Sequence, residues 1–264
     1  MDLASGPAPQ ERIIPQIEIV SLSKRYGNAH NILDDLTLSV AKGEFVSLVG
    51  PSGCGKSTVL KLISGLVPVT SGEVRVDGMT PKNARETISF VFQDATLLPW
   101  RTVRANVGLG LELERVPAEK RNAKVDSLLE LVGLSHVGKA YPRELSGGMK
   151  MRVSIARALA TGPRLLLMDE PFAALDEISR DRLNEELLRL REEQKWTVVF
   201  VTHSVAEAVF LSSRIVVLAP SPGRIHAEVA VDLPYPRTAP LRATSAYEKQ
   251  VVEISRLLRE ARSS

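Results

Sequence analysis

The sequence has 264 residues, of which 44% are hydrophobic and 25% charged, a balance typical of a soluble globular protein with a sizeable core. It contains no apolar run long enough to span a bilayer, and its N-terminus lacks the basic-then-apolar order of a signal peptide, so we expect a cytosolic protein. The net charge of +3 favours a solvated mixed-charge surface over a nucleic-acid interface, and a single cysteine, Cys54, excludes an internal disulfide.

The N-terminal region predicts a tail followed by strands. Residues 1–16 contain three prolines and little apolar periodicity, which indicates a mobile tail. Apolar residues then alternate with polar ones, as in half-buried strands, at Ile17, Ile19, Leu36, Leu38 and Val40. Tyr26 falls between these strands, where it either packs at a strand end or stacks on a purine ring.

A glycine-rich stretch, residues 50–58, fits the pattern G-x-x-x-x-G-K-[ST] of a phosphate-binding loop. A strand-like run precedes it and a helix-like run, Ser57 to Ser64, follows, which is the context this motif requires. Backbone N–H groups and the helix N-terminus then face the phosphates, Lys56 reaches the β- and γ-phosphates, and the Ser57 hydroxyl ligates Mg²⁺. The predicted nucleotide-binding residues of the loop are Gly50, Pro51, Ser52, Gly53, Cys54, Gly55, Lys56, Ser57 and Thr58. Beside Lys56 at a helix N-terminus, Cys54 is also expected to be a reactive thiolate that MgATP protects from maleimide.

The middle of the chain changes from strands to helices. Residues 71–78 and 88–92 predict strands, and the second strand ends at Gln93. The apolar side chains of Leu97, Leu98 and Trp100 either pack in the interior or form an exposed docking patch. Residues 103–160 predict mostly helix, with helical spacing at Val125, Leu128, Leu129 and Val132, so we interpret this block as an inserted helical subdomain.

The segment Leu145–Lys150 reads Leu-Ser-Gly-Gly-Met-Lys and leads into an apolar helix that runs to about Ala160. Ser146 is a candidate N-cap, and the two glycines beside it allow a close approach to the backbone. This segment is either a plain capped helix or a second anion site. Because the first loop already holds one nucleotide, the second site would serve a nucleotide held by another subunit.

Polar residues follow two apolar strands at their carboxyl ends, where ligands bind in parallel sheets. After the first strand, Asp169 is placed to hold Mg²⁺ and Glu170 to orient or deprotonate an attacking water. The strand at 197–202 ends in His203, which is either structural or in contact with the γ-phosphate. The remaining predictions are turns at 174–176 and 221–224, a strand at 214–218, an irregular segment at 233–237 and a closing amphipathic helix carrying Val251, Ile254 and Leu258.

The order of these motifs resembles the nucleotide-binding subunit of an ATP-binding cassette (ABC) transporter. The resemblance covers nearly all of residues 17–220 and rests mainly on the phosphate-binding loop together with Leu-Ser-Gly-Gly. The segments Leu97–Trp100, Met149–Met151, Pro222–Ile225 and Leu233–Pro234 are similar to the nitrate/sulfonate/taurine branch of bacterial importers.

The resemblance implies a role for individual residues. Tyr26 would stack on adenine, Gln93 would sense Mg²⁺ and the γ-phosphate, and His203 would be the switch histidine. Ser146, Gly147 and Gly148 would contact ATP on the opposite subunit, and Asp176 would link the two sites of the dimer. Glu170, His203, Gln93 and Lys56 would be catalytic, and Ser57, Gln93 and Asp169 would hold the metal ion. Leu97, Leu98 and Trp100 would help to dock the permease.

The resemblance also implies an α/β P-loop NTPase fold, with a RecA-like parallel sheet core, an antiparallel β subdomain and an inserted α-helical subdomain. The nucleotide-binding domain would span residues 17–235, with its helical insert at about 94–145, and a C-terminal helical tail would span 236–264. Two copies with ATP and Mg²⁺ would form a head-to-tail dimer on membrane permease subunits.

The implied activity is ATP hydrolysis that energises import of a small sulfonate-, nitrate- or taurine-like solute. A separate solute-binding protein would select the solute, and the ATPase would lie peripherally on the cytoplasmic face of the bacterial inner membrane. The alternative is a non-transport ABC ATPase of DNA repair or the ribosome, but the chain lacks sustained heptads and a second cassette. A GTPase-like switch would need an Asn-Lys-x-Asp motif, which the sequence also lacks.

Overall fold

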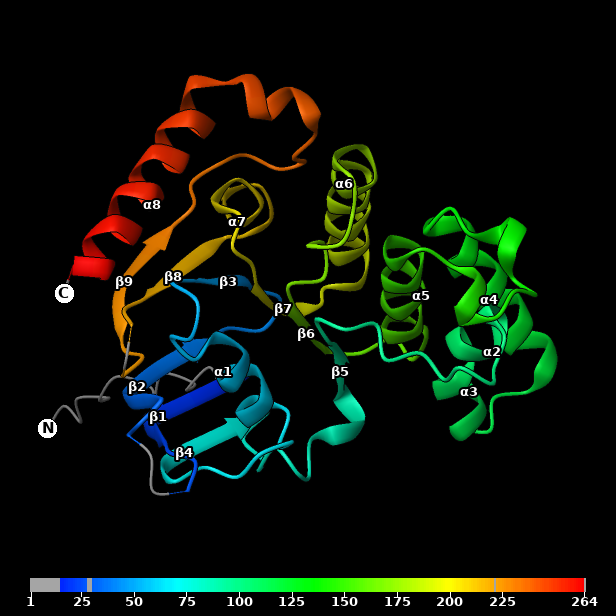
Figure 1. Ribbon diagram of the computed structural model, residues 1–264, viewed down its shortest axis with the longest axis horizontal. Helices are drawn as coiled ribbons and strands as arrows, with labels where there is room; N and C mark the ends of the chain where they lie inside the picture. The colour runs from blue at the N-terminus through cyan, green and yellow to red at the C-terminus, as the bar shows by residue number, and fades with distance from the viewer. Residues whose placement is uncertain (1–14, 28–29, 221, 264) are drawn as a thin grey trace, which may run out of the picture.

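The computed structural model describes residues 15–27, 30–220 and 222–263, so residues 1–14 of the predicted tail lie outside the described residues. Figure 1 shows a central sheet with a smaller sheet and α1 on one side and α6, α7 and α8 on the other. A group of helices lies at one end of the molecule, beyond β5 and β6. This arrangement is the predicted α/β architecture.

The central sheet has the strand order β5-β6-β7-β3-β8-β9. Its strands are β3 (Phe45–Val49), β5 (Ile88–Val91), β6 (Leu165–Asp169), β7 (Thr197–Val201), β8 (Arg214–Leu218) and β9 (Ile225–Ala230). Neighbouring strands are parallel from β5 to β8, and β9 runs antiparallel to β8. Because the four strands β5, β6, β7 and β3 are parallel, their carboxyl ends meet at the same edge of the sheet.

The sheet separates two hydrophobic cores, because successive side chains of a strand point to opposite faces. In β6, Leu165 and Leu167 face α1 (Lys56–Ile63) and the small sheet, whereas Leu166 and Met168 face the opposite core. Every residue of β3, β6 and β7 is buried, as expected for apolar strands covered on both faces.

The small sheet is antiparallel and has the strand order β2-β1-β4. Its strands are β1 (Ile17–Lys24), β2 (Leu33–Val40) and β4 (Ser71–Val76). Ile17 pairs with Val40 and Ile19 with Leu38. These side chains and that of Leu36 are buried, which confirms the predicted alternation.

The helical group comprises α2 (Val103–Val107), α3 (Leu109–Leu113), α4 (Ala118–Leu131) and α5 (Gly147–Ala160). Short 3₁₀ helices lie at Arg85–Thr87, Ser135–Val137, Pro142–Glu144 and Ala239–Ala243. The four positions predicted at helical spacing, Val125, Leu128, Leu129 and Val132, are all buried. The prediction of a helical block in this region is therefore confirmed.

Two α-helices and one strand have no counterpart among the predicted elements: α6 (Glu177–Gln194), α7 (Val205–Leu211) and β9. In α6, charged residues surround a narrow buried stripe, so the helical periodicity of the apolar residues is weak. In β9, no residue is fully buried, which is typical of an edge strand. The closing helix is confirmed as α8 (Ser245–Ser263), on which Ile254 is fully buried. Among the described residues, no helix has the length and apolar character needed to cross a bilayer.

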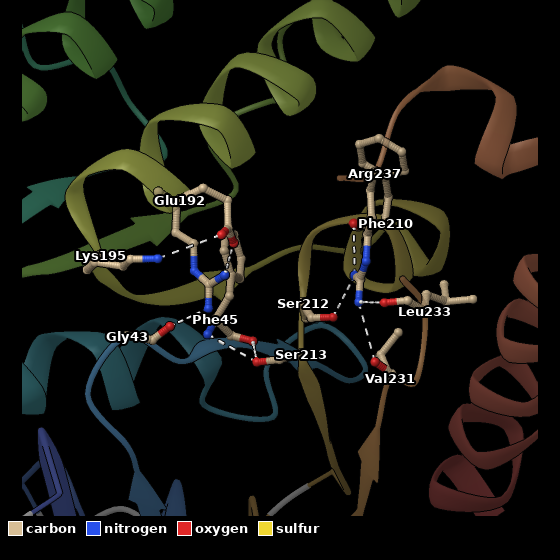
Figure 2. Close-up of polar contacts among 11 residues, drawn as sticks. Gly43, Phe45, Glu192, Lys195, Phe210, Ser212, Ser213, Val231, Leu233 and Arg237 are labelled. Carbon is tan, nitrogen blue, oxygen red and sulfur yellow. Dashed lines mark hydrogen bonds and ion pairs between the residues drawn. The ribbon is translucent and has the colours of Figure 1, made fainter. Parts of the chain in front are cut away.

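The predicted irregular segment at 233–237 carries a buried guanidinium. Arg237 is only 3% exposed, and Figure 2 shows its side chain among the carbonyl groups at the end of α7 and after β9. It donates hydrogen bonds to the carbonyls of Val209, Phe210, Ser212, Val231 and Leu233. This side chain therefore joins the segment that leads to α8 to the C-terminal end of α7.

Candidate nucleotide-binding site

A cleft of about 410 Å³ opens where β3, β5, β6 and β7 end. Its lining residues are Ile32, Ser52, Gly53, Gly55, Lys56, Ser57, Thr58, Gln93, Glu170 and His203. Six of them belong to the glycine-rich loop and the start of α1, and Gln93, Glu170 and His203 follow three different strands. The structure thus brings together the loop and the residues at strand ends that the sequence predicted to share one site.

The loop leaves β3 and turns sharply into α1. Gly55 precedes α1 with φ 95°, and Gly53 has φ 81°, conformations that glycine adopts without steric cost. Lys56 is buried, and its ammonium donates to the carbonyls of Gly50 and Pro51 at 2.9 Å each. The free N–H groups at the start of α1 and this ammonium make the loop a positive, anion-binding surface.

Two oxygen-bearing side chains, Ser57 and Asp169, meet where α1 approaches the end of β6. The hydroxyl of Ser57 donates to Asp169 Oδ1 at 2.9 Å, and Asp169 is 4% exposed. Burial raises the pKa of Asp169, and the hydrogen bond from Ser57 opposes this effect. Hydroxyl and carboxylate oxygens are the ligand types that Mg²⁺ prefers, so this donor set fits that ion.

Glu170 and His203 contact each other at the side of the cleft. His203 Nε2 lies 2.6 Å from Glu170 Oε1, and the Glu170 side chain is 13% exposed. Glu170 has φ 49°, an unusual conformation for this residue type, and its N–H donates to the Val201 carbonyl of the neighbouring strand. Backbone strain of this kind is concentrated at functional sites. The carboxylate therefore leaves the end of β6 in a fixed direction, beside the cleft.

A buried network behind this pair was not predicted. Glu207 of α7 is 6% exposed; its Oε2 accepts a 2.5 Å hydrogen bond from the Thr202 hydroxyl. Its Oε1 lies 3.4 Å from Nε of Arg180, which also donates to the Leu175 carbonyl. Burial raises the pKa of Glu207. These residues line a second cavity of about 300 Å³ that also borders Glu170 and His203. The network fixes the residue next to His203, and the only signal for it in the sequence is a glutamate four residues after that histidine.

Cys54 corrects one prediction. Its side chain is fully buried in the core between the two sheets rather than in the cleft lining. Burial raises the pKa of the thiol and outweighs the lowering by the nearby Lys56 ammonium. The prediction of a reactive thiolate is therefore wrong, because a helix N-terminus and a lysine do not compensate for removal of the sulfur from water.

Tyr26 lies outside the lining of the cleft. Its side chain is 42% exposed, and the ammonium of Lys24 lies 4.6 Å from the ring centroid. Ile32, which was not predicted, is the residue of this region that does line the cleft. The structure therefore places an exposed aromatic ring two residues after the end of β1, outside the lining of the cleft.

The Leu-Ser-Gly-Gly segment also lies outside the cleft lining. Ser146 caps α5 by accepting a hydrogen bond from the Met149 N–H, as predicted. A Cβ atom at Gly148 would lie 3.2 Å from the Ala174 carbonyl, so this segment packs against the loop that leads to Asp176. Asp176 in turn caps α6, and its hydrogen bonds with Ser179 lower its pKa. The two segments that the family resemblance assigns to dimer contacts are thus neighbours.

The apolar segment after Gln93 divides into a packed and an exposed part. Leu97 packs against the large core, whereas the side chain of Trp100 is 71% exposed. The fully buried Asn106 holds the segment in place by bonding both the N–H and the carbonyl of Leu98. Of the predicted docking residues, Trp100 is therefore the one that is plainly accessible.

Comparison with known proteins gives one consistent result. The ABC transporter family model matches residues 33–173. An uncharacterized ABC transporter ATP-binding protein from Methanocaldococcus jannaschii is 45% identical over 93% of each chain. The aliphatic sulfonates import ATP-binding protein of Bacillus licheniformis is 46% identical over 79% of this chain and 80% of its own. The bicarbonate transport ATP-binding protein of Synechococcus elongatus is 48% identical over 80% of this chain but only 32% of its own.

A solved structure agrees with these relatives. A dimeric ATP-binding cassette in a post-hydrolysis state, bound to ADP and Pi, superimposes with a TM-score of 0.76 at 33% identity. The match covers 82% of this chain and 99% of that cassette. On these findings and on its own phosphate-binding loop, the chain belongs to the ABC transporter family.

Proposed function

We propose that this chain is the ATP-hydrolysing subunit of an importer, which energises passage of a small solute through a separate membrane permease. The observation that carries the proposal is the contact between Glu170 and His203 beside a cleft that is otherwise formed by the phosphate-binding loop. The names of relatives that import sulfonates or transport bicarbonate support the importer assignment. They also favour it over a role in DNA repair or at the ribosome.

The nucleotide would bind with its phosphates on the loop. The N–H groups between Gly50 and Thr58 and the N-terminus of α1 would hold the β- and γ-phosphates, because both present positive dipole ends. Lys56 would exchange its bonds to the Gly50 and Pro51 carbonyls for bonds to phosphate oxygens. Tyr26, exposed just after the end of β1, would stack on the adenine.

Ser57, Asp169 and Gln93 would hold Mg²⁺. The first two are already in contact, and Gln93 borders the same cleft. Mg²⁺ commonly takes one or two protein oxygens and completes its shell with waters and phosphate oxygens, so this sparse donor set suits it. When bound, the ion supplies positive charge that neutralises the phosphate oxygens during phosphoryl transfer.

Glu170 would orient the attacking water and accept its proton. The carboxylate leaves β6 directly after Asp169 and lines the cleft, while Nε2 of His203 lies 2.6 Å from one of its oxygens. With ATP bound, His203 would turn to the γ-phosphate and leave that oxygen free for the water. Losing a positioned general base typically lowers the rate by about 10²–10⁴-fold.

A second copy of the chain would complete each site. Ser146, Gly147 and Gly148 lie away from the cleft of their own subunit, as expected of residues that reach a partner's nucleotide. Gly148 packs against the loop that leads to Asp176, which would link the two sites. The dimeric state of the similar cassette structures supports this head-to-tail arrangement.

The permease would dock beside the helical insert. Trp100 is exposed there, and Leu97 and Leu98 would support it from the packed side of the same segment. A separate solute-binding protein would select a sulfonate-, nitrate- or taurine-like solute. The ATPase would then lie peripherally on the cytoplasmic face of the inner membrane.

The test separates hydrolysis from binding. We expect Glu170→Gln to bind ATP normally, to hydrolyse it about 10²–10⁴-fold more slowly, and to accumulate as an ATP-bound dimer on size-exclusion chromatography. Lys56→Ala should instead lose affinity for the nucleotide. Glu186→Gln, which changes a half-buried carboxylate of α6 that pairs with Arg189 and does not line the cleft, is the matched control and should behave as wild type. A Glu170→Gln protein that stays monomeric in saturating ATP, or hydrolyses at the wild-type rate, would refute the assignment.

A further inference from the structure

One turn near the phosphate-binding loop has no role in the proposed function. Residues 222–224 form part of the connection between β8 and β9, which Figure 1 shows beside β2. The N–H of Gly223 donates to the Ile32 carbonyl at 2.8 Å, and the N–H of Asp34 donates to the Gly223 carbonyl at 3.2 Å. The Arg224 guanidinium also pairs with the Asp34 carboxylate. This turn therefore joins the edge of the central sheet to the start of β2.

Only glycine fits at position 223. A Cβ atom there would lie 2.0 Å from the carbonyl oxygen of Cys54 and 3.0 Å from Leu33 Cδ2. A backbone carbonyl cannot rotate away as a long side chain can, so an added methyl group must displace either the loop or the turn. Gly223 is not among the residues with positive φ, so the requirement is one of space and not of backbone conformation.

The Cys54 carbonyl belongs to the peptide group whose other end faces the cleft. In a trans peptide the C=O and N–H bonds point in opposite directions. With its oxygen against Gly223, the Cys54–Gly55 peptide directs the Gly55 N–H away from the turn. Gly55 lines the cleft and immediately precedes α1, where N–H groups bind phosphate. The turn thus contacts the carbonyl side of the Cys54–Gly55 peptide, and the N–H side of the same peptide is directed toward the nucleotide site.

Two further close contacts confine the loop. A Cβ atom at Gly50 would lie 2.8 Å from the Leu218 carbonyl at the end of β8, and one at Gly55 would lie 2.5 Å from Leu33 Cδ2. The loop is therefore held between the end of β8, the first residue of β2 and Gly223. Because each side is occupied, a displacement forced at Gly223 is transmitted to the loop.

We propose that Gly223 is a positioning residue for the phosphate-binding loop, which it holds through the Cys54–Gly55 peptide. The proposal rests on the proposed function, since it takes this loop to be the site of ATP. Gly223→Ala should weaken binding of both ATP and ADP about tenfold, the change expected when one charge-assisted hydrogen bond to phosphate is lost. The KM for ATP should rise more than kcat falls, because Glu170 and His203 lie on other strands.

The experiment compares Gly223→Ala with Gly138→Ala and wild type by calorimetric titration with ATP and ADP. Gly138 is a matched control, because a Cβ atom there would meet only the flexible side chains of Arg104 and Leu129. Wild-type protein that binds no ATP would refute the proposed function. Wild-type affinity in Gly223→Ala, with ATP binding to wild type intact, would refute the present proposal alone. A tenfold loss in Gly223→Ala but not in Gly138→Ala supports it.

Labelling of Cys54 gives a second measurement, since it is the only cysteine in the sequence. If the turn holds the loop, Gly223→Ala and Arg224→Ala should both react with maleimide faster than wild type while their circular dichroism and thermal unfolding show a folded protein. Arg224→Ala adds no atoms and removes only the pair with Asp34, so it keeps the test available if Gly223→Ala does not fold. Unchanged labelling of Cys54 in the folded variants would overturn the proposal.

Discussion

Replacement of Arg237 by methionine should destabilise the whole domain. The guanidinium donates five hydrogen bonds to main-chain carbonyls, and three of these carbonyls, Val209, Phe210 and Ser212, lie at the C-terminal end of α7. Figure 2 shows the guanidinium beside Phe210 and Ser212. The last carbonyls of a helix have no partners within the helix, and a cation near them is stabilising. Methionine keeps the length and fills the space but leaves these carbonyls without their donor.

The expected loss of stability is the difference between the hydrogen bonds that Arg237 makes and the cost of burying its charge. A hydrogen bond to a charged group contributes about 1.5–3 kcal/mol, but the five share one cation whose burial is itself costly. Desolvation lowers the pKa of Arg237, which is the sign of this cost. We therefore expect a loss of about 3–5 kcal/mol, as for removal of one member of a buried charged network. For a chain of this size each kcal/mol lowers Tm by about 2–4 °C, so Tm should fall by roughly 10 °C.

Thermal unfolding followed by circular dichroism measures this shift. Arg256→Met is the control, because the pairs of Arg256 with Glu253 and Glu260 are exposed on the surface of α8, and such pairs contribute about 0–1 kcal/mol. ATP affinity at low temperature should not change, since Arg237 does not line the cleft. A Tm of Arg237→Met within about 2 °C of wild type, less than the effect expected of 1 kcal/mol, would refute this reasoning.

Further predictions concern three residues of the site and its surroundings. Glu207→Gln should lower kcat by about tenfold or more with little change in ATP affinity, since it weakens the support of Thr202 beside His203; an unchanged kcat would contradict this role. The same change should not lower Tm at neutral pH, because a raised carboxyl pKa means that the charged form costs folding free energy there. This cost declines as pH falls through the folded pKa and is gone below the unfolded pKa. Native Cys54 should react slowly with maleimide at pH 7 and faster as pH rises; labelling as rapid as in denatured protein would contradict its burial. Trp100→Ala should spare ATP binding but weaken co-purification with the permease, and an undiminished complex would exclude Trp100 from the interface.

The sequence predicts those site residues whose positions depend on the strand or helix next to them in the chain. The phosphate-binding loop lies between a strand and a helix, and Asp169 and His203 lie directly at or after apolar strands. Because parallel strands direct their carboxyl ends to one edge, their convergence follows from the fold class. The same reasoning predicts the capping role of Ser146, which needs only its neighbours in the chain.

The parts that the sequence does not predict depend on packing between distant segments. Cys54 has the neighbours of a reactive thiolate, yet the two sheets bury it. Glu207 and Arg180 pair only because α6 and α7 lie against each other, and neither helix has a strong apolar periodicity. In the sequence, Gly223 is typical of an ordinary turn. Only the structure shows that the carbonyl of Cys54 leaves no space for a Cβ atom at this position. In each case the deciding neighbour is far away in the chain.

The two tryptophans of the sequence lie in opposite environments. Trp100 is 71% exposed on the segment before α2, and Trp196, next to the start of β7, is 5% exposed. The unmodified chain therefore carries two separable fluorophores. Emission from Trp100 is open to quenching by iodide and reports events at the helical insert, whereas the shielded, blue-shifted emission of Trp196 reports the integrity of the central sheet. Steady-state fluorescence can thus distinguish a surface that has become covered from a domain that has begun to unfold, without any label.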